Sequence, residues 1–293
     1  MRAAHRLHLS LSIETGAAAP RSAFAPWAGL AAAALMAVAS LAGILSPATY
    51  ARETPAWTGQ ALGQDWADLV LGVPALALAG LGARRGSRTA ALVLAGAFVY
   101  TLYTFVLYAF AVHFNRVFLV YCAVLGLSFF GLASQVRELA RVDARTWYRA
   151  GAPRRAAGGF LVGVAALFAL LWLSEIIPAL VADRTPATIT EVGLFTNPVH
   201  VIDLSVILPA LLIAGLGLYR GAMPGLVLGP VLLVFSTLMA ASIAAMMFVM
   251  RAYGYAASMA VATAMVALTT VTAVMTIWLL RHVEPAARYP SAP

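Results

Sequence analysis

The sequence contains no lysine, a single cysteine and few charged residues. The lone Cys122 excludes an internal disulfide, a CxxC redox pair and a multi-cysteine metal site. Charged residues make up 10% of the 293 residues, whereas soluble domains carry about 25%. Hydrophobic residues make up 62%, and they gather in long runs between short charged patches. This pattern is typical of a multi-pass helical membrane protein.

The positive charge comes from arginine alone. Nineteen arginines against eleven acidic residues give a net charge of +8. A basic balance can indicate nucleic-acid binding, but here the arginines lie between the apolar runs, as the positive-inside bias of membrane proteins requires. We therefore expect the lipid bilayer as a partner and no nucleic acid. Heavy use of Arg, Ala and Gly without lysine indicates GC-rich codons and a prokaryotic source.

Eight apolar runs are long enough to cross about 30 Å of hydrocarbon as helices. The sequence thus predicts an all-α, polytopic membrane protein. The expected transmembrane helices cover residues 26–46, 66–83, 89–113, 116–136, 159–182, 199–219, 225–250 and 256–280.

An internal repeat organises these spans. Residues 68–86, DLVLGVPALALAGLGARRG, return as residues 203–221, DLSVILPALLIAGLGLYRG, with eleven of nineteen positions identical. Corresponding spans start 133 to 140 residues apart, so the repeated unit is a whole four-helix bundle. The predicted domains are a cytosolic leader (1–25), a first repeat (26–136), a basic cytosolic linker (137–158), a second repeat (159–280) and a cytosolic tail (281–293).

Arginine placement predicts the orientation. With the N-terminus inside, the cytosolic segments hold fifteen arginines and the opposite side holds four, which indicates that both termini are cytosolic in the plasma membrane. An even number of spans per repeat makes the two repeats parallel, as in some transporters. The linker carries Trp147 among its arginines, and it is either a helix, extending the fourth span or lying on the inner leaflet, or a plain basic connector.

Ionisable residues inside the spans are the candidate functional groups, because burying a charge in the bilayer costs at least about 2.5 kcal/mol. Asp68 and Asp203 are placed near the outer ends of the second and sixth spans. An arginine follows each of them by 48 residues, which predicts the ion pairs Asp68–Arg116 and Asp203–Arg251. These pairs are either clamps between helices or part of a site for an anion, a cation or a proton.

Residues that differ between the repeats are the better candidates for specificity. Glu175 corresponds to Ser40 and lies in the outer half of the fifth span. We expect it to approach Asp203 and His200, forming a substrate-binding site, although an acid hydrogen-bonded inside the bundle is the alternative. His113 lies near the same level, and the two histidines are interpreted as interfacial caps more readily than as metal ligands, since no H-x-x-x-H spacing is present.

Two further patterns have both a functional and a structural interpretation. Pro74 and Pro209 each follow a repeated Asp by six residues and free a backbone carbonyl one turn earlier, which either creates a hinge or cation ligand or is simply tolerated. Tyr100, Thr104 and Tyr108 share one helical stripe, which either lines a polar cavity or packs inside the bundle.

Three classes of function remain open. The leading interpretation is a transporter or permease-like protein for a small solute or ion, with an outward-facing polar site. The second is a non-catalytic membrane subunit or sensor, within a homo- or hetero-oligomer, whose Asp–Arg pairs are structural. A membrane-embedded enzyme using Glu175, Asp203 and His200 is the third and has no motif in its favour. No catalytic residue, metal or cofactor is predicted.

Overall fold

The computed structural model describes residues 24–141 and 143–285. All but the last two residues of the predicted leader, and the predicted tail from residue 286 on, lie outside these ranges. Within them the chain forms helices and loops, with one isolated bridge between Tyr148 and Val283 as its extended pairing. The helical elements are α1 (Phe24–Leu45), η1 (Pro47–Thr49), α2 (Pro55–Ala67), η2 (Asp68–Gly72), α3 (Val73–Arg84), α4 (Arg88–Ala111), α5 (Phe118–Ala140), η3 (Ala144–Trp147), α6 (Arg154–Val181), α7 (Ala187–Val192), α8 (Pro198–Ile202), η4 (Asp203–Ile207), α9 (Leu208–Arg220), α10 (Met223–Ala252) and α11 (Met259–Leu280).

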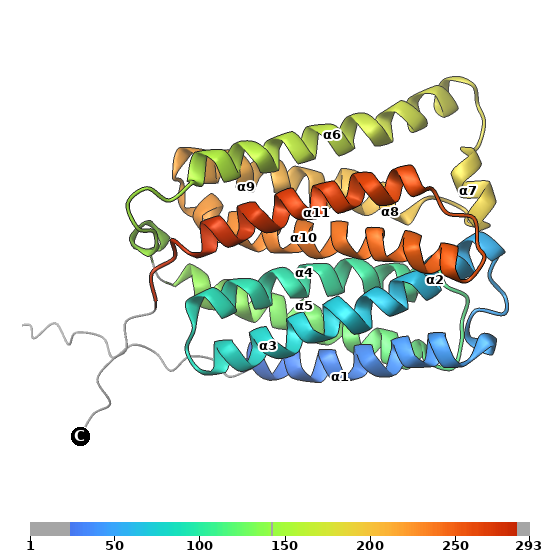
Figure 1. Cartoon of the computed structure of the whole chain (residues 1–293), viewed down its shortest axis with the longest axis horizontal. Coiled ribbons are helices and arrows are strands. Elements are labelled where there is room, and N and C mark those ends of the chain that lie inside the picture. The colour runs from blue at the N-terminus through green and yellow to red at the C-terminus, as the bar shows by residue number, and fades with distance from the viewer. Residues whose placement is uncertain (1–23, 142, 286–293) are drawn as a thin grey trace, which may run out of the picture.

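As predicted, eight helices are long and apolar enough to cross a membrane. They run side by side along the long axis of the molecule (Figure 1). The start of α1 and the end of α11 lie at the same end, which also carries the basic connection between α5 and α6. We call this the basic end and the other the far end.

The second membrane helix starts earlier than predicted. Residues 55–65 precede the predicted span 66–83, but they form most of α2, which continues without a break through η2 into α3. Thr54 caps the helix by accepting a hydrogen bond from the Trp57 amide, and Pro55 occupies the first turn, where its missing N–H has no cost. The hydropathy pattern missed the start of this helix because hydropathy indicates which residues can lie in lipid and does not indicate where a helix begins.

A widened helical turn begins at each repeated aspartate. In η2 the Val73 amide donates to the Asp68 carbonyl, and in η4 the Leu208 amide donates to the Asp203 carbonyl, both across five residues. Each π turn ends two residues before a proline, which lacks an N–H and would crowd the carbonyl of the preceding turn in a regular α-helix. The backbone effect predicted for Pro74 and Pro209 is therefore a local widening of two continuous helices.

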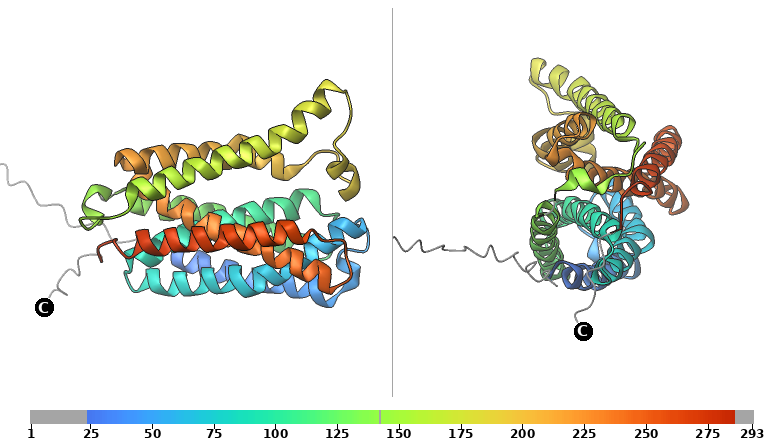
Figure 2. Two further views of the ribbon diagram at one scale, coloured as in Figure 1. Left: turned by 45° about the horizontal axis from the view of Figure 1, so that its top comes forward. Right: turned by 90° about the vertical axis from the view of Figure 1, so that its left-hand side faces the viewer.

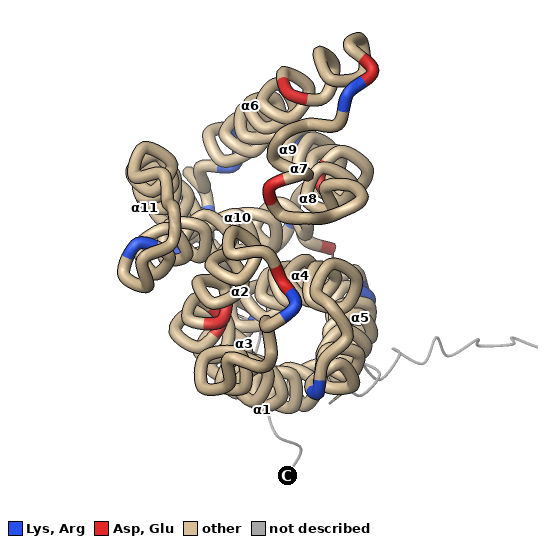
Figure 3. Tube along the Cα trace, turned by 90° about the vertical axis from the view of Figure 1, so that its right-hand side faces the viewer, with Lys and Arg blue, Asp and Glu red and all other residues tan. Residues whose placement is uncertain are grey.

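The first four membrane helices close into a ring. α1 packs against α3 and α5, and α4 packs against the same two helices, as the end-on views show (Figures 2 and 3). The centre of the ring is filled by large buried side chains such as Met36, Leu94 and Phe98.

The last four membrane helices do not close in this way. α6 packs on α9 and α11 packs on α10, while α6 and α11 have few contacts with each other and lie apart (Figure 3). α10 also packs against α2 and α4 and so joins the two halves. The second half is therefore open between α6 and α11.

The linker between the halves is packed against the protein. α5 extends through Ala140, which fits the predicted extension of the fourth span. Trp147 is 1% exposed, and the Arg88 guanidinium lies 5.0 Å from the centre of its ring. The Tyr148 hydroxyl donates to the Leu226 carbonyl over 2.6 Å. Trp147 thus contacts protein, not the surface of the inner leaflet.

Candidate functional site

A cavity of about 520 Å³ lies between the two halves, toward the far end of the helices. Its walls come from α2 and α4 of the first half and from α6, α8, η4, α9, α10 and α11 of the second. Most of the lining is apolar, with Phe168, Leu171, Phe235, Met239 and Met265 among the contributing side chains. A concave, mostly apolar chamber of this size is typical of a small-molecule site.

Asp203 is the acidic group in the cavity wall. The residue is 8% exposed, and the Trp172 indole N–H donates to Oδ2 over 2.8 Å. The Tyr103 side chain, from the first half, also interacts with this carboxylate. Trp172, Tyr103 and Asp203 all line the cavity, so the acid is held by donors from two helices and can in turn accept a hydrogen bond from a ligand.

Glu175, His200 and Asp203 lie near one another, as predicted, but Trp172 connects them: it contacts His200 and donates a hydrogen bond to Asp203. The Trp172 and His200 rings are 4.7 Å apart between centres, and His200 Nε2 lies 3.8 Å from Glu175 Oε2. The Thr188 hydroxyl donates to the other Glu175 oxygen. Asp203 faces the cavity, whereas Glu175 and His200 are absent from its lining and lie behind Trp172.

Asp68 lies in a different place from Asp203, inside the closed first half. It is fully buried, and its Oδ1 atom accepts hydrogen bonds from the Tyr100 hydroxyl at 2.6 Å and from the Gln64 amide at 2.9 Å. Both aspartates lie about 25 Å along their helices from the basic end. However, the helix of Asp68 continues outward to Pro55, so this acid lies mid-helix and not at the end where the sequence placed it.

Asp65, one turn before Asp68, belongs to the same buried cluster. Its two oxygens accept hydrogen bonds from the Tyr50 hydroxyl at 2.7 Å and the Tyr108 hydroxyl at 2.8 Å. Tyr50 lies in the loop after α1, and burial together with the nearby Asp65 carboxylate raises its pKa well above the usual value. Tyr50 therefore stays a hydrogen-bond donor at neutral pH.

The predicted Asp–Arg pairs are not formed. The ion pairs in the described part of the chain include His113–Glu53, Arg141–Glu138, Arg149–Glu284 and His200–Glu175, and neither aspartate pairs with its predicted arginine. Arg116 and Arg251 are exposed at the far end of the molecule, where their guanidinium groups remain hydrated. The two aspartates turn inward and are satisfied by neutral donors, so equal sequence spacing did not produce contact.

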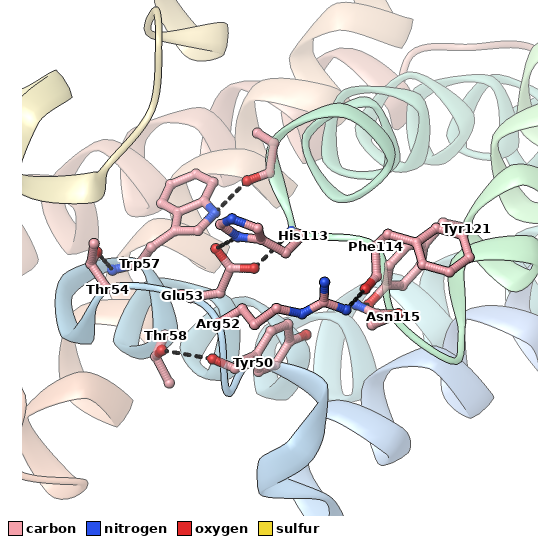
Figure 4. Close-up of polar contacts among 11 residues, drawn as sticks. Tyr50, Arg52, Glu53, Thr54, Trp57, Thr58, His113, Phe114, Asn115 and Tyr121 are labelled. Carbon is pink, nitrogen blue, oxygen red and sulfur yellow. Dashed lines mark hydrogen bonds and ion pairs between the residues drawn. The ribbon is translucent and has the colours of Figure 1, made fainter.

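His113 belongs to a polar cap over the far end and not to the cavity. Its backbone N–H donates to Glu53 over 2.7 Å, and its Nδ1 lies 2.9 Å from the other Glu53 oxygen (Figure 4). Arg52 donates to the Phe114 carbonyl, and the Trp57 indole donates to the Ala111 carbonyl over 2.7 Å. Because Trp57 also lines the cavity, this cap fixes one of the cavity walls.

Replacing Glu53 by alanine is expected to lower the free energy of unfolding by about 1–2 kcal/mol. The Glu53 side chain is 2% exposed, and its loss removes the acceptor of the His113 backbone N–H and the partner of the His113 ring. The measurement is the melting temperature of the purified protein in detergent. Glu53→Gln keeps one acceptor oxygen and is expected to lose less, whereas equal melting temperatures for wild type and Glu53→Ala would contradict the role of the cap.

Sequence reasoning missed Gln64, Tyr103 and Trp172. Gln64 lies before the predicted span 66–83, and Tyr103 lies outside the stripe of Tyr100, Thr104 and Tyr108. Trp172 lies one turn before Glu175 on the same helix face, a spacing that was available as a signal. No group of three or more His, Cys, Asp or Glu side chains suited to a metal ion occurs in the part of the chain that the structure describes.

A scan against protein-family models and searches of curated proteins and of solved structures found no match to this chain.

Proposed function

We propose that the protein is a permease-like membrane protein that binds a small, mostly apolar molecule with one polar group. The observation that supports this proposal is the 520 Å³ cavity between the halves, with an apolar lining and Asp203 in its wall. The apolar part of the ligand contacts Phe168, Leu171 and Met265, and its polar group donates a hydrogen bond to Asp203.

The chemistry of the lining favours such a molecule over an inorganic ion or a sugar. A hydrophilic solute loses its hydration shell in a chamber with few polar groups, and each unmatched polar group costs about 1–3 kcal/mol or more. A few fixed polar groups in an apolar chamber instead orient a ligand whose surface is mainly apolar. The sequence left the ligand open as a small solute or ion, and the cavity lining favours a small, mainly apolar solute.

The open second half supports entry from the bilayer. Leu171 of α6 and Val261 of α11 line the cavity, and they are 50% and 41% exposed. The cavity therefore reaches the molecular surface beside the two helices that have few mutual contacts. A lipid-soluble ligand can use this side without crossing the polar cap at the far end.

The proposal includes the topology expected from arginine placement, with both termini cytosolic and two parallel four-helix repeats. The π turns at Asp68 and Asp203 support a common origin of the halves. In this view the first repeat is a closed scaffold, and the second has opened to form the binding chamber.

The test is to identify molecules that co-purify with the full chain. Organic extracts of wild type, Asp203→Ala and Ala240→Phe are compared by mass spectrometry after purification in a mild detergent. Asp203→Ala removes the acceptor, and Ala240→Phe places a ring into the cavity wall. We expect a molecule present in wild type to fall at least tenfold in both variants, since about 1.4 kcal/mol of lost binding is tenfold in affinity.

The matched control is Glu191→Gln on the exposed surface of α7, which is expected to retain the molecule. If all four proteins carry the same molecules in equal amounts, the cavity is not the binding site. Once identified, the molecule is loaded into proteoliposomes. Its exchange across the bilayer distinguishes a permease from a sensor or subunit that binds without moving its ligand.

A further inference from the structure

Two carboxyl groups lie buried together in the closed first half, outside the cavity. Asp65 and Asp68 are three residues apart on one helix and are 1% and 0% exposed. Two like charges at this spacing repel each other, and a charge buried in a bilayer protein needs a neutralising partner. If both carboxyl groups are ionised, the site therefore needs about one positive charge to neutralise it.

The groups that face this pair supply hydrogen bonds but no positive charge. They come from each packed segment: Ser40 of α1, Tyr50 after α1, Tyr100 and Tyr108 of α4, Tyr121 of α5, which stacks on Tyr108, and Ser242 of α10, which donates to Gln64. No Arg or His is among the hydrogen-bond or ion-pair partners of either acid in the described ranges. Tyrosine hydroxyls and an amide stabilise one negative charge but do not cancel two.

Two buried oxygen atoms in the cluster have no hydrogen-bond partner. They are Asp68 Oδ2 and Ser40 Oγ, and the Ser40 hydroxyl lies beside the Asp65 carboxyl. Ser40 is 1% exposed. Unsatisfied buried oxygens are rare because each costs about 1–3 kcal/mol. A proton on Asp68 Oδ2 removes one charge and turns this orphan acceptor into a donor.

The cluster is connected to the cavity by two of its members. Gln64 donates to Asp68 and Tyr108 donates to Asp65, and both side chains also line the cavity. Hydrogen bonds thus run from the cavity wall to each carboxyl group. The other hydroxyl donors, Tyr50 and Tyr100, are buried and do not line the cavity.

We infer that Asp65 and Asp68 form a proton-binding site that exchanges its proton with the cavity through Gln64 and Tyr108. The pair holds one proton, and the four donors stabilise the remaining negative charge. The site itself does not depend on what the cavity binds. Together with the proposed permease function, it supplies the means by which a proton gradient drives ligand movement.

The first experiment detects the proton directly. Infrared difference spectra of the full chain in lipid nanodiscs are recorded from about pH 5 to pH 9, a range in which an ordinary exposed carboxyl is already ionised. We expect a C=O stretch of a protonated carboxyl in wild type and its loss in Asp65→Asn and in Asp68→Asn. The control Asp183→Asn, in the exposed turn after α6, is expected to keep the band.

A band unchanged in both variants would overturn the assignment. So would displacement of the band at constant pH by sodium chloride but not by choline chloride, because that result would identify a sodium site. No ligand is needed for these measurements, so the proton site and the cavity proposal can fail separately. Circular dichroism shows whether each variant retains its helices.

The second experiment tests the route. Transfer into D₂O shifts the carboxyl band, and the rate of this shift reports exchange of the proton. We expect Gln64→Leu combined with Tyr108→Phe to slow the shift at least tenfold. The control Tyr121→Phe keeps both hydrogen bonds to the carboxyl groups and is expected to exchange at the wild-type rate. Equal rates in all three proteins would exclude the route through the cavity.

Discussion

The Gly158→Ala variant is expected to lose about 3 kcal/mol of unfolding free energy or more, while Gly159→Ala one residue later is expected to lose none. A Cβ atom at Gly158 would lie 2.5 Å from the Gly215 carbonyl oxygen and 2.7 Å from the Tyr219 amide nitrogen. Both are backbone atoms of α9, which cannot move without moving the helix. Small residues permit the close approach of membrane helices, and an added methyl group has no room there. Overpacking of this kind costs about 1–3 kcal/mol and occasionally more.

Gly159 provides a matched control on the same helix. A Cβ atom there meets nothing within 4 Å, and alanine favours a helix over glycine by up to about 1 kcal/mol. Unfolding by sodium dodecyl sulfate titration in mixed micelles measures both variants against wild type. Similar stabilities for the two variants would mean that α6 and α9 are not in backbone contact.

The Gly43→Ala variant is expected to lose about 2–3 kcal/mol through the buried acid cluster of the first half. The added Cβ atom would overlap Asp65 Oδ2 and would lie 2.7 Å from the Tyr50 hydroxyl, which are the two atoms of one hydrogen bond. Displacing the carboxyl leaves the buried Tyr50 hydroxyl without its acceptor and removes the shorter of the two hydrogen bonds of Tyr108. The overpacking and the unsatisfied donor add to the loss.

The comparison for Gly43 is Gly126→Ala on α5, where a Cβ atom meets nothing within 4 Å. The same titration is used, so the two variants differ only in what the methyl group contacts. If the added methyl group acts through the Asp65 carboxyl, the losses of unfolding free energy in Gly43→Ala and Asp65→Asn do not add in the double variant. Equal unfolding curves for Gly43→Ala and Gly126→Ala would show that α1 does not press against the cluster.

Hydropathy predicted the membrane helices because it records which stretches can face lipid. Sequence spacing also predicted contacts between neighbouring helices. Glu175 and His200 come together because the chain turns back after α6, through α7, and places α8 beside the end of α6. The pairs Asp68–Arg116 and Asp203–Arg251 failed because similar depth does not fix the direction in which a side chain points. The aspartates point into the protein, and the arginines remain in water.

The sequence by itself determined the eight apolar helices, the repeated segment around Asp68 and Asp203, and the positions of the prolines that follow the π turns by two residues. These properties are local, since each depends on a few neighbouring residues. Only the tertiary structure decided that Tyr103 of the first half reaches Asp203 of the second, and that α6 and α11 stay apart to leave a cavity. Those outcomes depend on the rotation and separation of packed helices, which small differences in side-chain volume along both helices set jointly.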